Sequence, residues 1–474
     1  MKKVKYSIDG GLEKKDLDII WGAALKLISQ HGLKVPHKGI LDIISKFDGV
    51  LIKNDIVTFD TELVLKAIKS QDYSDWPEKV NPDNFGIVSG AYIKDFIDLD
   101  NGLIRPANMQ DLIDSTKLCE AYGLYGPPCV RPNEEPVELQ RLLMYKTSYE
   151  YSRTKGHGIF DVAGWLNPRE ARIGKEMADA AGKDFRIDLW LISPFLAPHM
   201  GLDILYEFRN EPVDMNVTNM PTTGTTAPIN MIDAYIQGIA EIFAGLTLIY
   251  VINESKSKKG RIRTVVIDSI RAYPFDMKYG LFVYGSAEDV LGTLYQSQIN
   301  KYFGIPLVAK SLLTTGKLPD SHAAAEKAAH AIVGALCGAT MFSNAGLLSV
   351  DEVYSAEQVV IDYEIVKFCK RIIDGYSFDE ELSAIEVIKE VGYVGSFMTH
   401  DTTLFNFKEN LWDPELFLHS SLEQWRKAGS KETVTLAREI AIEKISNQSY
   451  IINKDVKKEL DRIYSYAKKD LCKE

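Results

Sequence analysis

The sequence lacks the features that mark several protein classes. Its five cysteines are odd in number and far apart, and no C-x-x-C pair suggests a zinc or redox site. Basic residues are fewer than acidic ones, 55 against 66, and the net charge of −11 is the opposite of the basic surface that nucleic acids require. No run of about eighteen uninterrupted apolar residues is present, and no apolar core follows the charged start MKKVKYSIDGG. These absences predict a cytoplasmic protein with reduced thiols, no nucleic acid partner and no membrane span.

The sequence also lacks metal and phosphate motifs. Its eight histidines show no H-E-x-x-H or similar spacing, so we expect no metal ligand cluster. The G-x-x-x-x-G-K-[ST] pattern of a phosphate loop is absent as well. What is present is a globular composition, with 46% hydrophobic residues over 474 positions, which is enough for a large core and an appendage.

Hydrophobic periodicity divides the chain into three parts. Residues 14–31 carry one apolar helical stripe that ends before Gly32, and alternating runs at 51–59 and 91–99 follow, which predicts a mixed N-terminal appendage over 1–105. From about 110 onward, helix-sized segments alternate with short apolar runs, which is typical of βαβ units and a parallel sheet. The number of strand–helix units and the length of this region favour a (β/α)8 TIM barrel over 106–380, because a smaller doubly wound sheet would need fewer strand–helix units. A helical C-terminal segment over 381–474 follows. The expected barrel strands include HGIFDVAGW, FRIDLWLIS, VDMNVTNM, RIRTVVIDS and PLVAKS, and the expected C-terminal helices are 413–427, 431–446 and 453–468.

The segment NMPTTGTTAPINM at 219–231 is predicted to be a βα loop, because a strand precedes it and a long apolar helix follows. In a barrel such a loop lies at the face where active sites form. Thr223 and Thr225 offer hydroxyls, Gly224 permits close backbone approach, and the start of the helix offers free amides to a small anion such as a carboxylate. The alternative is that the threonines cap the helix and the prolines stiffen the turn. The sequence leaves both open.

At NMPTTGTTAPINM the chain resembles the trimethylamine methyltransferase superfamily, in particular its non-pyrrolysine branch of glycine betaine methyltransferase-like enzymes. Further similar segments occur in the same order and cover nearly the whole chain. They are HGLKVPHKGILDIISKFDGVLIKNDIVTF, DLDNGLIRPANMQDLID, KLPDSHAAAEKA, SAEQVVIDYEI and GSFMTHDTTLFNFKENLWDPELF. In the last of these, Ser396 and Thr402 stand where many members have histidine, so ligand or partner contacts there are expected to differ.

The resemblance implies a barrel enzyme that moves a methyl group from a small amine to cob(I)alamin. The corrinoid would be supplied by a separate corrinoid protein, and no cofactor would be bound permanently by this chain. The trimethylamine branch uses pyrrolysine, which this sequence does not contain. A quaternary, betaine-like amine is therefore favoured over trimethylamine. Demethylation releases a neutral amine, so no general acid and no catalytic side chain of this chain is required.

A permanently charged ammonium group has no proton to donate, so aromatic faces and carboxylates must hold it. Tyr92 and Trp165 are further candidate rings from neighbouring loops. For each single ring, ordinary core packing is the competing explanation. Asp276 is suited either to facing the cation or to capping a loop, and Lys310, at a strand end, is suited to a substrate carboxylate or to the corrinoid. The predicted substrate-binding residues are His157, Phe195, Asn219, Thr223, Thr225, Tyr273, Phe275, Asp276, Lys310, Phe397 and His400.

Two other functions stay open at this point. Lys310 at a strand end also fits a Schiff-base lysine of a barrel aldolase or lyase. A betaine-binding protein without activity is the third reading. The sequence leaves a monomer and a homo-oligomer equally open, since the apolar helices expected at 229–252 and 322–342 suit a subunit interface as well as internal packing.

Overall fold

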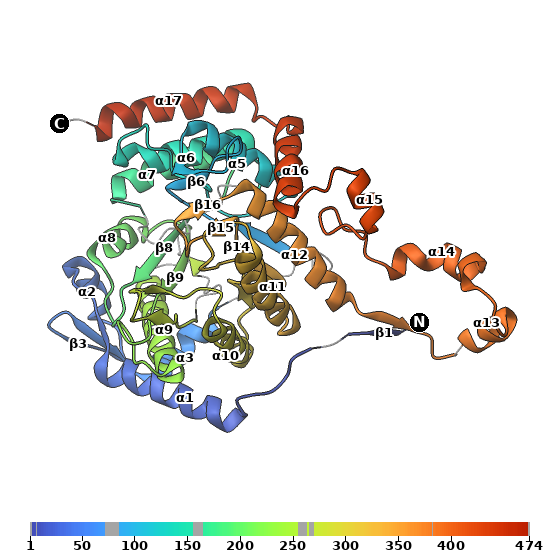
Figure 1. Cartoon of the computed structure of the whole chain (residues 1–474). Helices are drawn as coiled ribbons and strands as arrows, with labels where there is room; N and C mark the ends of the chain where they lie inside the picture. Colours follow the sequence, from blue (N-terminus) through green and yellow to red (C-terminus); the bar gives the residue numbers. More distant parts are fainter. Residues whose placement is uncertain are drawn as a thin grey trace.

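The computed structural model describes residues 2–5, 7–71, 85–154, 165–254, 263–264, 270–381 and 383–472, and Figure 1 shows how their elements are arranged. The helices are α1 (Lys14–Lys26), η1 (Leu27–His31), α2 (Lys38–Ile44), α3 (Thr61–Lys69), α5 (Met109–Tyr122), α6 (Val137–Tyr151), α7 (Pro168–Ala181), α8 (His199–Phe208), α9 (Met231–Glu254), α10 (Ala287–Phe303), α11 (Ser321–Leu336), α12 (Ala356–Asp374), α13 (Ala384–Val391), η2 (Phe397–Thr399), α14 (Asp401–Asn410), α15 (Leu422–Lys427), α16 (Thr433–Asn447) and α17 (Lys454–Leu471). The strands are β1 (Lys2–Val4), β2 (Leu33–Lys34), β3 (Val50–Lys53), β4 (Ile56–Phe59), β5 (Gly86–Ser89), β6 (Asp95–Ile97), β7 (Ile104–Pro106), β8 (Arg186–Leu191), β9 (Asp214–Asn219), β10 (Arg263–Thr264), β11 (Phe275–Asp276), β12 (Leu281–Phe282), β13 (Val308–Ala309), β14 (Met341–Ala345), β15 (Leu347–Leu348), β16 (Val353–Tyr354) and β17 (Tyr376–Phe378).

The N-terminal part combines helices with a small antiparallel sheet, as its patterns predict. The apolar stripe of 14–31 forms α1 and the π-helical turn η1, and Gly32 ends it with a φ of 80°. The alternating run at 51–59 is a hairpin, in which β3 pairs with β4 and β4 pairs with β2. This N-terminal part is not structurally separate from the rest of the chain, because its strand β5 pairs in parallel with β14.

Two parallel sheets of three strands each form the centre of the fold, in the orders β10-β9-β8 and β13-β14-β5. The mixed α/β class is confirmed. The expected closed barrel is not seen, since the described strands form separate sheets rather than one continuous ring. The expected strand HGIFDVAGW lies outside the described residues except for Trp165.

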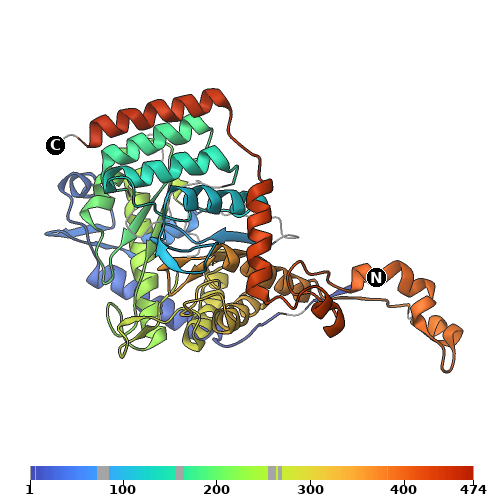
Figure 2. The same ribbon diagram turned by 45° about the horizontal axis from the view of Figure 1, so that its top comes forward.

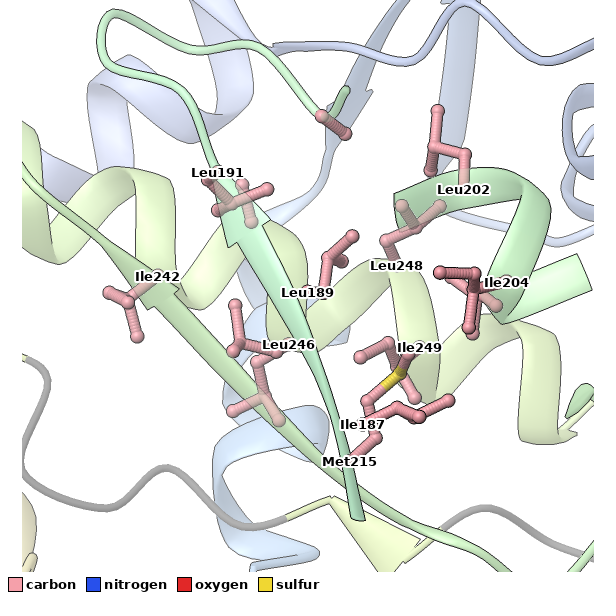
Figure 3. Close-up of a cluster of buried hydrophobic side chains, with 14 of the residues drawn as sticks. Ile187, Leu189, Leu191, Leu202, Ile204, Met215, Ile242, Leu246, Leu248 and Ile249 are labelled. Carbon is pink, nitrogen blue, oxygen red and sulfur yellow. The ribbon is translucent and has the colours of Figure 1, made fainter. Parts of the chain in front are cut away.

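The helix α9 forms much of the core on one side of the β8-β9 sheet. Strand alternation directs Ile187, Leu189 and Leu191 of β8 toward α8 and α9, where they meet Leu202 of α8 and Leu246 of α9 (Figure 3). Among the described helices α9 is the one long and apolar enough to cross a membrane, and 89% of that stretch is buried inside the chain. The apolar side chains of α9 are therefore used for internal packing. The helix is thus not available as the subunit interface that was considered for 229–252.

Two helix predictions were wrong in their bounds. The helix expected over 322–342 ends at Leu336, because Gly338 takes a φ of 93° and β14 begins at Met341. The helix expected over 413–427 forms only over Leu422–Lys427, where the Ser421 side chain caps its start by accepting from the Gln424 amide. The expected helices 431–446 and 453–468 are confirmed by α16 and α17.

Candidate functional site

The face of β8 that points away from α8 and α9 is polar and carries one large ring. Asp188 and Trp190 alternate with the buried Ile187 and Leu189, so they project from the opposite face. Both side chains are only partly buried, and Thr218 of β9 stands directly beside Trp190. The indole Nε1 of Trp190 has no hydrogen-bond partner within the described ranges. A carboxylate and an indole thus lie two residues apart on the face of β8 opposite α8 and α9.

A tyrosine pair continues this surface. The hydroxyl groups of Tyr92 and Tyr145 are 2.7 Å apart and hydrogen-bonded, and the ring of Tyr145 lies 5.7 Å from that of Trp165. Burial raises the pKa of Tyr145 well above its ordinary value, and the Tyr92 hydroxyl and the charge of Asp188 raise it further. Tyr145 therefore stays neutral beside Asp188. We call Tyr92, Tyr145, Asp188 and Trp190 the aromatic-acidic cluster.

Tyr273 connects the carboxyl ends of the two parallel sheets. Its backbone N–H donates to the oxygen of Pro221 at 2.9 Å, and its own oxygen accepts from the N–H of Thr223 at 2.9 Å, just past the end of β9. On the other side, the Nζ of Lys310, just past the end of β13, donates to the Tyr273 hydroxyl at 3.0 Å. Thr223, Tyr273 and Lys310 are thus brought together as the sequence predicted for strand-end residues, at an edge where ligands of α/β sheets bind.

The threonine loop is folded on itself rather than around the start of α9. The hydroxyl of Thr225 donates to the oxygen of Thr222, and the hydroxyl of Thr226 accepts from the N–H of Thr222. Helix α9 begins only at Met231, and the Asn230 side chain accepts from the amides of Ile232 and Asp233.

Both explanations offered for the loop are therefore wrong in part. The threonines do not cap α9, and the Asn230 side chain already occupies amides that were expected to bind an anion. Gly224 has a φ of 76°, and an added Cβ would lie 2.7 Å from the side chain of Met277, so glycine is required here by the loop itself.

A buried carboxylate ties the loop after β8 to the end of β9. Glu241 of α9 accepts from the Ser193 hydroxyl at 2.6 Å, the Phe195 amide at 3.1 Å and the Asn219 side chain at 2.7 Å. Burial raises the pKa of Glu241, and its donors oppose that rise. Because the Asn219 amide group faces two acceptors, its Oδ1 is directed elsewhere, and it has no hydrogen-bond partner among the described residues. Asn219 therefore offers an oxygen dipole, whereas Phe195 packs its ring against His31.

A fully buried charge cluster lies beneath Tyr273. The guanidinium of Arg271, 5.3 Å from the centre of the Tyr273 ring, donates to Asp289. Asp289 also accepts from the Gly285 amide at 2.9 Å and faces the Nδ1 of His330 at 3.7 Å, while the Nε2 of His330 contacts the Thr293 hydroxyl at 2.6 Å. Burial raises the pKa of Asp289, but Arg271 and the other partners lower it by more, so the carboxyl stays ionised. The Arg271 guanidinium, fixed by Asp289, therefore supports the ring of Tyr273.

The buried His330 predicts a loss of stability in mild acid. Burial lowers the pKa of His330 from 6.5 to about 4, despite the opposing charge of Asp289. Between these two values the unfolded chain binds a proton that the folded chain does not, so the free energy of unfolding falls as the pH falls, by up to about 3 kcal/mol. Urea unfolding across this window measures the effect. In His330→Gln the fall in the free energy of unfolding over this pH range should vanish. If the variant kept the pH profile of the unmodified protein, His330 would not be its cause.

The other predicted residues are not all brought to this edge. Phe275 packs its ring 5.7 Å from Phe282, near Tyr273, and Asp276 caps its own turn by accepting from the amides of Lys278 and Tyr279. His157 lies outside the described residues. Phe397 and His400 lie on the segment that projects from the body in Figure 2, and the structure does not place them with the rest.

Three residues of the aromatic-acidic cluster were missed as site residues by the sequence reasoning, namely Asp188, Trp190 and Tyr145. A signal existed for the first two, because FRIDLWLIS alternates polar and apolar positions in a strand expected to be buried on both faces. Tyr145 lies in a helix and offers no such signal. The part of the chain that the structure describes contains no group of three or more His, Cys, Asp or Glu side chains that could hold a metal ion.

Comparisons with known proteins agree over most of the length. A family model described as trimethylamine methyltransferase (MTTB) matches residues 11–470. A trimethylamine methyltransferase MttB of Desulfitobacterium hafniense (strain DSM 10664 / DCB-2) is 23% identical over 92% of this chain and 89% of its own length. A glycine betaine methyltransferase of Desulfitobacterium hafniense (strain Y51) is 24% identical over 89% of each chain. Among solved structures, a monomethylamine methyltransferase (MtmB) of Methanosarcina barkeri matches with a TM-score of 0.48 and 11% identity, over 93% of this chain and 89% of that one.

Proposed function

Because this chain belongs to the trimethylamine methyltransferase family and is a methyltransferase, we propose that it takes a methyl group from a small quaternary amine of the betaine type. The methyl acceptor in this proposal is the cob(I)alamin of a separate corrinoid protein, which supplies the nucleophile when it is docked. The observation that carries the substrate class is the aromatic-acidic cluster, since rings and a carboxylate are what a permanent cation needs.

The residues of this chain would bind and orient the substrate rather than exchange protons with it. The leaving group is a neutral tertiary amine that needs no proton, so no general acid has to be found. Trp190 and the tyrosine pair would replace the water around the ammonium group, and the negative charge of Asp188 on the same face would favour the cation. Lys310, held by the Tyr273 hydroxyl, would bind the substrate carboxylate. The Oδ1 of Asn219, which has no hydrogen-bond partner among the described residues, adds an oxygen dipole at the end of β9.

The closed (β/α)8 barrel is part of the same proposal. Tyr273 and Lys310 already connect the carboxyl ends of the two three-stranded sheets, as neighbouring arcs of one barrel require. The division into an appendage over 1–105, a barrel over 106–380 and a helical segment over 381–474 remains proposed, with β5 counted toward the barrel sheet. A cytoplasmic location belongs to the proposal too.

A substrate panel with chemically reduced cobalamin tests this function. Glycine betaine, proline betaine, carnitine and γ-butyrobetaine are compared with trimethylamine and with dimethylglycine, which keeps a carboxylate but has no permanent charge. We expect at least one quaternary amine to convert cob(I)alamin to methylcobalamin, followed by its absorbance, and neither control to do so. Turnover of trimethylamine alone would overturn the substrate class. Reduction with borohydride in the presence of a carbonyl substrate tests the lyase reading of Lys310, for which no adduct is expected.

A further inference from the structure

Residues 379–411 form a projecting segment that we call the arm. It contains α13, η2 and α14, and both views show it extending away from the rest of the chain (Figures 1 and 2). None of the residues described in these three elements is buried. Its base is fixed, because β17 pairs antiparallel with β1 from the other end of the chain. The arm therefore leaves the body at a defined place and has no cover of its own.

The arm is too apolar and too short to be stable in water by itself. Tyr393 and Val394 are fully exposed, and Ile388 and Phe405 are 60% and 72% exposed. Helices of 8 and 10 residues, the lengths of α13 and α14, are marginal without tertiary packing. The exposed large apolar side chains of the arm are Ile385, Ile388, Tyr393, Val394, Phe397, Met398, Leu404, Phe405, Phe407 and Leu411. An exposed patch of this extent marks a protein interface.

We propose that the arm packs on a second copy of this chain, so that two chains exchange arms around a two-fold axis. Ten such side chains expose on the order of 1,000 Å² per chain, and two arms would bury roughly 2,000 Å², the size of a permanent dimer interface. The corrinoid protein of the proposed function has to leave with its methyl group, and short-lived contacts of that kind are smaller and more polar. Because the exposed side chains of the arm are mostly apolar, the arm is better suited to a permanent partner than to a short-lived contact.

The chain also presents a surface that such an arm can cover. Phe368 and Ile372 are exposed one turn apart at the end of α12, close to the base of the arm. Basic residues surround them, since Lys367, Lys370 and Arg371 stand in the same turns. Lys370 pairs with Asp374, and Arg371 donates to the Asn410 oxygen at the base of the arm of the same chain. The arm carries seven acidic residues against two basic ones over 379–411, so its charge is opposite to that of this patch. Both halves of a self-complementary interface are thus present on one chain.

Sedimentation analysis of the full chain tests the arm exchange. We expect a mass twice the 53.2 kDa of one chain. The double variant Ile388→Asp with Phe405→Asp should raise the dimer dissociation constant at least 100-fold, and Phe368→Asp on the receiving patch should act in the same direction. The controls Ile19→Asp and Leu51→Asp place the same charge on side chains that are 69% and 70% exposed elsewhere, and they should leave the mass unchanged.

Circular dichroism of every variant separates dissociation from unfolding. A single-chain mass for the unmodified protein at micromolar concentration would overturn the proposal, as would an assembly that the arm and patch variants leave intact. If the unmodified chain is a monomer and only the corrinoid protein protects the arm, the occupant is that partner and the second copy is excluded. The inference stands apart from the choice of substrate, so failure of the amine panel does not affect it.

Discussion

Replacing Asp289 with asparagine is expected to lower the free energy of unfolding by about 3–5 kcal/mol, because it leaves a buried charge without its counter-ion. Arg271 and Asp289 are both fully buried, Nη2 of the guanidinium donates to Asp289, and its Nε and Nη1 have no hydrogen-bond partner in the described part of the chain. The asparagine keeps the shape of the side chain and removes only the charge. Urea unfolding followed by circular dichroism measures the loss.

Two further variants separate charge from packing. Glu62→Gln removes a carboxylate from the exposed pair with Lys66, and it should leave the unfolding midpoint unchanged within error. Arg271→Met combined with Asp289→Leu removes both charges and should recover much of the stability that Asp289→Asn loses. A loss below about 1 kcal/mol in Asp289→Asn would show that the guanidinium charge is relieved by water, contrary to its burial.

Local patterns predicted the elements of this protein better than their assembly. The stripe of 14–31 and the alternating run at 51–59 depend on contacts within a few residues, so their signals are in the local sequence. The pairing of β5 with β14 joins residues more than 250 positions apart, and no local pattern specifies it. The same limit explains why the chain was divided at 105, although β5 contributes to a parallel sheet.

The site was predicted where it depends on strand ends and missed where it depends on packing. Thr223, Tyr273 and Lys310 each follow an apolar run, and the carboxyl ends of parallel strands meet at one edge. Asp188 and Trp190 lie inside a strand, and their role depends on which face the helices α8 and α9 cover. For Asp276 the sequence left a cation contact and a loop cap open, and the carboxylate caps its own turn.

Trp190→Ala is expected to lower kcat/KM for the best quaternary amine by about 10- to 100-fold, which corresponds to roughly 1.4–2.8 kcal/mol for one desolvated cation–π contact. Trp190→Phe keeps an aromatic face and should retain most of the activity. Asp188→Asn removes the negative charge from the same face, and we expect it to weaken binding of the cation without abolishing the fold. Steady-state kinetics with the corrinoid acceptor in excess measures these values.

A neutral isostere shows whether Trp190 recognises charge or only shape. Where glycine betaine is the substrate, tert-butylacetate has the same outline with carbon in place of the charged nitrogen. The unmodified enzyme should bind the cation more tightly than the isostere in calorimetry, because an indole face attracts positive charge while both ligands bury similar apolar area. Trp190→Ala should reduce this preference and leave the affinity for the isostere less affected. Equal losses for both ligands would mean that the indole only fills space, and the ammonium group would then have to lie elsewhere along the edge that Tyr273 and Lys310 define.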